Sequence, residues 1–324
     1  MMQIKKEKTF YSSLIILQSL IFGISFIAVK NLLIAGVPTF FLNAIRFLIG
    51  TIFLFVFSKV LNLSKTCVAK YGKNKFVTLK ELIGGLITGA VLAAAYALQT
   101  LGANTTSPAK NGLFTDLFVI YVPILSMIFL SRKFSIKTII SAILAIVGVM
   151  LVLNVFAETP TFVIGDLFSI ICGIIFSAHF ILLEIYSAKQ SEQGKSLNPY
   201  NFTTIQLLVV ALINFVISLS TEIRLYITID WGKSIGWLLF LGIVSSAFAY
   251  TLQFFAQEKI SADLTALLSC SESIFTLIIS LFFGFDQFNW IFILGAIILI
   301  VAMILATINT NRNNGEANAT KDNK

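Results

Sequence analysis

Long apolar runs, separated by short polar or turn-forming segments, occupy almost the whole chain. Each run reaches the roughly 20 residues that a helix needs to cross the roughly 30 Å hydrocarbon core of a bilayer. Because backbone groups in lipid must find hydrogen-bond partners within their own segment, runs of this length are expected to be helices. The pattern predicts ten transmembrane helices, at residues 10–32, 38–59, 80–101, 107–131, 135–156, 163–186, 199–220, 233–255, 260–284 and 288–308.

The amino-acid composition supports a membrane protein and excludes the soluble fold classes. Hydrophobic residues make up 57% of the 324 positions and charged residues 12%, whereas soluble chains carry roughly 25% charged residues. Cys67, Cys172 and Cys270 stand far apart, without the spacing of a metal site or of a disulfide framework. The sequence motifs of nucleotide-driven transport and of the familiar hydrolases are absent. We therefore expect no metal, no cofactor and no enzymatic activity.

The basic residues predict the orientation of the chain in the membrane. Most of the 23 lysines and arginines fall on one side if the N-terminus is cytoplasmic, as the positive-inside rule requires. The sequence therefore predicts a multi-pass protein of the cell (cytoplasmic) membrane with both termini in the cytoplasm. We expect residues 1–9 to form a cytoplasmic N-terminus, 60–79 a basic inner loop, and 309–324 a disordered cytoplasmic tail. Since the lysines cluster in loops beside the membrane spans, where orientation explains them, the net charge of +8 does not indicate a nucleic-acid partner.

The two halves of the chain repeat each other. Matched positions include Gly23/Gly173 and Phe26/Phe176 at a shift of 150 residues, and Tyr96/Tyr250 and Gln99/Gln253 at a shift of 154. We expect two five-helix repeats, 10–156 and 163–308, and an odd number of spans inverts the second relative to the first. Inverted repeats are the architecture of many secondary transporters, whose substrate site lies near the bilayer midplane between the halves.

Both halves resemble the EamA domains of the drug/metabolite transporter superfamily, over about residues 10–308. The likeness rests on the segments IFGISFIAVK, NAIRFLIGTIFL, VPILSMIFLSRKFSIKTIISAILAIVGVMLV and SESIFTLIISLFFGFDQFNWIFILGAIILIVAMIL. The chain departs from the family pattern at Ser273, where the pattern has proline, and at Asp286, where it has glutamate. The loss of the proline predicts a straighter ninth helix. The resemblance implies proton-driven or exchange transport of amino acids, nucleosides, other metabolites or drugs.

Ionisable residues deep in a span are costly and are functional candidates for that reason. Asp116 and Glu272 lie near the middle of the fourth and ninth spans, so they could form a cation site or carry a proton-coupled step. His179, the only histidine, lies in the inner half of the sixth span and could share that role. The alternative is that each bonds to a neighbouring helix and serves packing. The family resemblance places the helix of Arg46 outside the central cavity, so we expect a structural ion pair or a carbonyl-bound arginine there.

The repeated polar-aromatic pairs are the second group of candidates. Tyr96 with Gln99, and Tyr250 with Gln253, each share one face of a helix because the residues stand three apart. With the halves inverted, the first pair is predicted near the outer mouth and the second near the inner mouth, as path-lining residues that gate alternately. Interhelical hydrogen bonding by glutamine is the alternative.

The function predicted from these features is that of a secondary transporter that exports or exchanges small organic metabolites. Its expected partners are a small-molecule substrate, the lipid bilayer and protons, with a homodimer left open. A passive channel and an intramembrane lipid-modifying enzyme are the alternatives. A channel would require rings of charge or a carbonyl-lined filter, and an enzyme a convergent set of acids and bases, neither of which the sequence displays.

Overall fold

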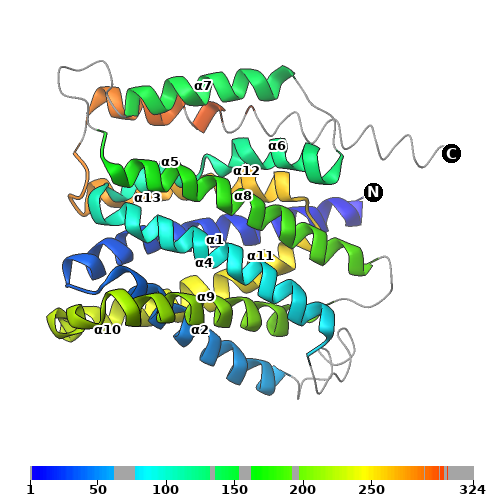
Figure 1. Cartoon of the computed structure of the whole chain (residues 1–324). Coiled ribbons are helices and arrows are strands. Elements are labelled where there is room, and N and C mark those ends of the chain that lie inside the picture. The colour runs from blue at the N-terminus through cyan, green and yellow to red at the C-terminus, as the bar shows by residue number, and fades with distance from the viewer. Residues whose placement is uncertain are drawn as a thin grey trace.

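The computed structural model describes residues 2–61, 77–131, 136–152, 162–191, 197–287, 289–298, 300–302 and 305. Regular structure within these residues is helical, with no β-strand, so the all-α prediction is confirmed for the part of the chain described (Figure 1). Most of the predicted basic loop 60–79 and the predicted tail 309–324 lie outside the described residues, as does Cys67.

The helices follow the apolar runs closely. They are α1 (Met2–Ile34), α2 (Thr39–Leu61), α4 (Leu79–Thr105), α5 (Pro108–Thr115), α6 (Phe118–Leu130), α7 (Ile136–Val152), α8 (Ile164–Ser191), α9 (Pro199–Thr221), the 3₁₀ helix η1 (Ile223–Thr228), α10 (Trp231–Leu239), the π-helix η2 (Phe240–Phe248), α11 (Ala249–Gln257), α12 (Ala262–Ser269) and α13 (Ser271–Phe282). Figure 1 shows most of these helices running roughly parallel in one bundle.

Eight segments of the described chain are long and apolar enough to cross a membrane. Three of them join consecutive pieces: α5 with α6, α10 through η2 to α11, and α12 with α13. The predicted fifth span appears as α7, of 17 residues, and the predicted tenth as a short apolar helix, Trp290–Ala302. Ten membrane crossings therefore remain a prediction.

Local sequence signals explain where the helices begin. Thr78 and Glu81 form a reciprocal capping box at the start of α4. Ser107 and Ser261 each accept a hydrogen bond from the backbone N–H three residues later, at the starts of α5 and α12. Between α1 and α2 the chain turns at Gly36, whose φ of +81° lies in the left-handed region that favours glycine.

The fourth and ninth predicted spans each form one apolar segment long enough to cross a membrane, Pro108–Leu130 and Ala262–Phe282, and each contains a short break in its regular helical hydrogen bonding. α5 stops at Thr115 and α6 starts at Phe118, whereas α12 stops at Ser269 and α13 starts at Ser271. Bonds from N–H groups to carbonyls three residues earlier, such as Ile120 to Leu117 at 2.9 Å, mark the first interruption. At the second interruption the N–H of Cys270 divides between the carbonyls of Ala266 and Leu267 without any proline, and the straighter ninth helix stays a prediction.

The eighth predicted span holds a further feature that hydropathy does not predict. Phe240–Phe248 winds as a π-helix between α10 and α11. It packs against α2, where Gly242 faces Ile49 so closely that a β-carbon on the glycine would stand 2.6 Å from Ile49 Cβ. π-Helical turns are rare, and they are frequently found at functional sites.

Candidate functional site

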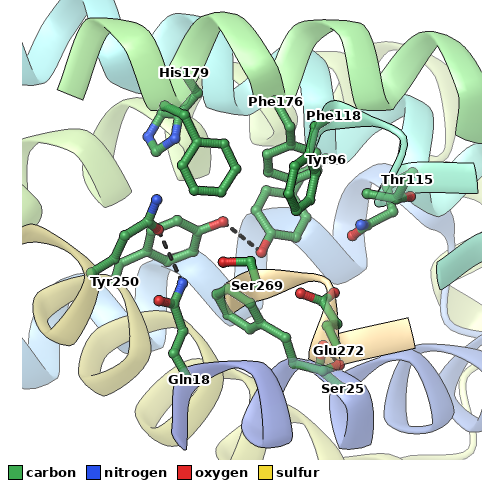
Figure 2. A pocket seen from close by; sticks show the side chains of 14 residues that line it. Gln18, Ser25, Tyr96, Thr115, Phe118, Phe176, His179, Tyr250, Ser269 and Glu272 are labelled. Atoms are coloured by element: carbon green, nitrogen blue, oxygen red, sulfur yellow. Dashed lines mark hydrogen bonds between the residues drawn. The ribbon is translucent and has the colours of Figure 1, made fainter. Parts of the chain in front are cut away.

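A buried cavity lies between α1, α4, α8, α11 and the two helix interruptions (Figure 2). Its space is about 20 Å³, which is room for about one water molecule. It is lined by Gln18, Phe22, Ser25, Tyr96, Gln99, Thr115, Phe118, Phe176, His179, Phe180, Tyr250, Gln253, Ser269 and Glu272. The lining comes from both repeats of the sequence.

Most of the residues singled out in the sequence meet at this cavity. The six that line it are Tyr96, Gln99, His179, Tyr250, Gln253 and Glu272. Asp116, the seventh, lies at the α5–α6 interruption, is fully buried and is not part of the lining. Sequence reasoning did not find Gln18 or Ser269, although both are polar residues within apolar runs.

The two tyrosines contact each other, which corrects their predicted placement at opposite mouths. The hydroxyl of Tyr250 donates a hydrogen bond to that of Tyr96 at 2.7 Å, and their rings meet nearly edge to face with centroids 6.2 Å apart. The reason is helix length, because α4 continues to Thr105, beyond the predicted end of the span. At 1.5 Å per residue, Tyr96 lies roughly 14 Å from that end.

The two repeated glutamines have different surroundings. Gln253 accepts a hydrogen bond from the side-chain amide of Gln18 at 3.1 Å and donates one to Gln257 at 3.3 Å. Gln257 in turn donates to the backbone carbonyl of Phe180 at 3.2 Å, so this chain of amides joins α1, α11 and α8. The backbone carbonyl of Gln99 accepts from Asn111 at 3.1 Å. Interhelical bonding, the alternative reading for glutamine, is therefore observed at Gln253.

The two acids occupy chemically distinct positions. Asp116 Oδ2 accepts hydrogen bonds from the backbone N–H of Ser273 at 3.0 Å and from its hydroxyl at 2.5 Å. Asp116 thereby caps the first turn of α13 across the two repeats, and a carboxylate at a helix N-terminus is favourable. Glu272 is 6% exposed and lines the cavity. Within the described residues the Glu272 carboxylate has neither a hydrogen bond nor an ion pair. Asp116 Oδ1 also lacks a hydrogen-bond partner but lies outside the lining, so Glu272 is the acid that a ligand in the cavity would meet.

His179 lies against Gln206 and Tyr250. Its Nε2 lies 3.0 Å from Nε2 of Gln206, whose Oε1 accepts from the hydroxyl of Thr88 at 3.4 Å. The ring also stands edge-on to Tyr250, with centroids 6.0 Å apart.

Arg46 has partners other than the ion pair or the backbone carbonyls expected from the sequence. The guanidinium donates to the hydroxyls of Ser245 and Ser246 at 3.2 and 3.4 Å, both on the π-helix η2. Its Cζ lies 4.7 Å from the centroid of Tyr96 and 4.9 Å from that of Phe47. A desolvated cation over an aromatic ring gains about 2 kcal/mol or more. Arg46, which does not line the cavity, thus stacks on the ring of the lining residue Tyr96. In the part of the chain described, its hydrogen-bond partners are neutral hydroxyls.

Several oxygen atoms around the cavity have no hydrogen-bond partner. They are Gln18 Oε1, Thr115 Oγ1 and Ser269 Oγ, all buried. An unsatisfied buried polar atom costs about 1–3 kcal/mol, so these atoms favour a polar occupant. No cluster of three or more histidine, cysteine, aspartate or glutamate side chains suited to a metal ion occurs among the described residues.

A second polar cluster lies at the end of the bundle where α1 and α4 stop. Lys30 Nζ donates to the carbonyls of Ala103 and Thr106 at 2.7 and 3.0 Å, which neutralises the C-terminus of α4. Lys110 lies 3.8 Å from Asp166, and that carboxylate also accepts from the hydroxyl of Thr106. These contacts tie α1, α4, α5 and α8 together beyond the cavity.

Comparison with known proteins gives the same picture from an independent direction. The sequence pattern described as the EamA-like transporter family matches residues 9–154 and again 163–308. The chain is 24% identical over 318 residues to the "Uncharacterized transporter YetK" of Bacillus subtilis (strain 168), covering 94% of this chain and 88% of that protein. It is 26% identical over 181 residues to an "Uncharacterized transporter" of Archaeoglobus fulgidus, covering 56% of this chain and 51% of the relative.

The fold is also similar to that of a protein of known crystal structure. The superposition covers 95% of this chain and 98% of the other chain, with a TM-score of 0.65 and 15% sequence identity. With most of the chain matched in two consecutive copies, the protein belongs to the EamA-like transporter family, and it is a multi-pass membrane transporter rather than an enzyme.

Proposed function

We propose that this transporter is a secondary carrier that exports or exchanges a small organic metabolite through the central cavity. Amino acids, nucleosides and drug-like solutes are the substrate classes to consider. The observation that carries the proposal is the meeting of Tyr96, His179, Tyr250 and Glu272 at one buried cavity, with contributions from both sequence repeats. Carrier sites are typically found between repeats, near the middle of the membrane.

The carrier is proposed to have ten membrane-spanning helices in two inverted halves, 10–156 and 163–308, with both termini in the cytoplasm. Matched features support this arrangement. Tyr96 and Tyr250 stand 154 residues apart and contact each other, and the same shift relates the N-caps Ser107 and Ser261. It also relates the last residues of α5 and α12. Interrupted helices at corresponding places in two halves are a feature of transporter binding sites.

Movement of the two halves is part of the proposal. A cavity of about 20 Å³ is far smaller than the roughly 300–1,000 Å³ of small-molecule sites, so a solute enters only when the helices separate. The amide chain through Gln253 lies on one side of the cavity, and the Lys30 cluster lies on the other. We propose that these two layers, with Gln99 and Gln253 beside the path, open in turn.

Proton coupling is proposed to run through Glu272, with His179 and Asp116 nearby. Glu272 is supported by its position in the lining and by the lack of a partner within the described chain. Asp116 is committed to Ser273 by two hydrogen bonds, so its role in coupling would be indirect.

The test is a proteoliposome efflux screen over amino acids, nucleosides and cationic dyes, with and without a pH gradient. We expect at least one class to leave faster than from protein-free liposomes, and the gradient to change its rate. Glu272→Gln is expected to abolish the effect of the gradient while leaving folded protein. If the double variant Asp116→Asn/Glu272→Gln transports with unchanged rate and pH dependence, the acids have no role. If no solute in the panel moves, the carrier itself is refuted.

A further inference from the structure

The lining of the central cavity has a distinctive chemical character. Six of its side chains are aromatic: Phe22, Tyr96, Phe118, Phe176, Phe180 and Tyr250. One is a carboxylate, Glu272, and among the described residues that line the cavity none is lysine or arginine. The faces of aromatic rings carry negative electrostatic potential and attract cations. The aromatic rings and the carboxylate therefore both favour a positively charged ligand.

Hydrogen-bond requirements point the same way. The carboxylate of Glu272 and the amide oxygen of Gln18 can only accept, and each is buried with lone pairs that no described side chain occupies. Gln18 already uses its amide nitrogen as a donor to Gln253 at 3.1 Å. The hydroxyls of Thr115 and Ser269, also without partners, can donate as well as accept. Among the groups that a solute could offer, a positively charged donor answers Glu272 best because charge-assisted hydrogen bonds are the stronger kind.

Arg46, a cation that stacks on the lining residue Tyr96, does not make the cavity suited to an anion. The guanidinium of Arg46 lies behind the ring of Tyr96, 4.7 Å from its centroid, and is not part of the lining. Its hydrogen bonds go to Ser245 and Ser246. An anionic solute would thus meet Glu272 without a paired cation, and a neutral solute would leave that carboxylate without a charged partner.

We propose that the cavity recognises the ammonium group of an organic amine, with Glu272 as its ion-pair partner and the aromatic rings around its apolar part. The inference rests on the proposed function, since it names the substrate class of the same site. Because the cavity is small, the amine binds in the conformation that opens toward one side of the membrane.

The test compares three probes of nearly equal shape and different charge: phenethylamine, which is protonated at neutral pH, 2-phenylethanol and 3-phenylpropionate. Binding to the full chain in lipid nanodiscs is measured by titration calorimetry, with protein-free nanodiscs to subtract partitioning. We expect the ammonium ion to bind at least tenfold more tightly than the alcohol or the carboxylate. Glu272→Gln should weaken its binding at least tenfold, and Phe176→Leu should weaken it severalfold.

The matched control is Asp230→Asn, which removes one negative charge from an exposed acid at the start of α10 and keeps a capping side chain. Its affinity for the ammonium ion should equal that of the unaltered chain. Equal affinity for the three probes, or unchanged binding in Glu272→Gln, would overturn the proposal. If that variant does not fold, the three-probe comparison on the unaltered chain decides alone.

Transport separates the two proposals. If amino acids or nucleosides are exported, and phenethylamine is neither exported itself nor an inhibitor of that export, the amine site is refuted and the carrier is not. Conversely, charge-selective binding of the amine without transport of any solute would support the site and refute the carrier.

Discussion

The pairing of Asp116 with Ser273 gives the most direct test of how the two interrupted helices hold together. The carboxylate accepts from both the backbone N–H and the hydroxyl of Ser273, at 3.0 and 2.5 Å. Hydrogen bonds to charged groups contribute about 1.5–3 kcal/mol in soluble proteins, whereas measured interhelical bonds in membranes average about 0.6 and reach about 1.7 kcal/mol. Because the hydroxyl bond is short, at 2.5 Å, and Asp116 caps α13, we expect this pair at the upper end of the range measured in membranes. We expect a coupling of about 1–2 kcal/mol between the two residues.

A double-mutant cycle measures that coupling. Asp116→Ala, Ser273→Ala and the double variant are purified, and their free energies of unfolding are determined by denaturant titration in mixed micelles. Each single change should destabilise the protein, and the double variant should lose less than the sum. Ser234→Ala is the control, since that serine bonds to the Asp230 carbonyl on α10, and its effect should add to that of Asp116→Ala. A coupling below about 0.5 kcal/mol, the size of ordinary non-additivity, would refute the cap.

Three further predictions concern the surrounding framework. Arg46→Lys should lower the free energy of unfolding by about 1–2 kcal/mol in the same titration, because a lysine cannot both stack on Tyr96 and fork between two hydroxyls. Gly89→Val should destabilise by about 1–3 kcal/mol through overpacking, since even a β-carbon would stand 2.8 Å from Val209 Cβ on α9. Thr78→Ala should cost about 1 kcal/mol through loss of the cap of α4, and Thr78→Ser, which keeps a capping hydroxyl, should restore most of it.

The sequence predicts much of the architecture because membrane crossing depends on the hydropathy summed along a segment of the chain. Apolar runs separated by Gly36, Pro108 and Pro199 place the helices within a few residues. Six of the seven candidate site residues line one cavity for a related reason, since polar groups within a span avoid lipid and turn toward one another. Whether those residues bind solute or protons stays a prediction.

What the sequence could not predict depends on contacts between distant segments. Near Asp116 and Cys270, backbone N–H groups bond to carbonyls three residues earlier instead of four. Hydropathy averaged over a span cannot detect this change, because the average depends only on composition. Asp116 bonds to Ser273 rather than to a solute because the first turn of α13 lies opposite it. The sequence predicts the tyrosines at opposite mouths because the predicted third span ends at residue 101, whereas α4 continues to Thr105 and the two hydroxyls meet.

The π-helical segment has a consequence for how this protein can change by insertion and deletion. Successive residues of an α-helix are rotated by about 100° around the axis, since 3.6 of them complete a turn. If Phe240–Phe248 wound as ordinary α-helical turns without losing a residue, everything downstream in that helix would swing through about that angle. Tyr250 and Gln253 would then face away from the cavity, although no residue that touches it had been altered. The wide turns of this nine-residue segment therefore set the rotational phase of α11, and loss of one residue there keeps that phase only if a wide turn becomes an ordinary one.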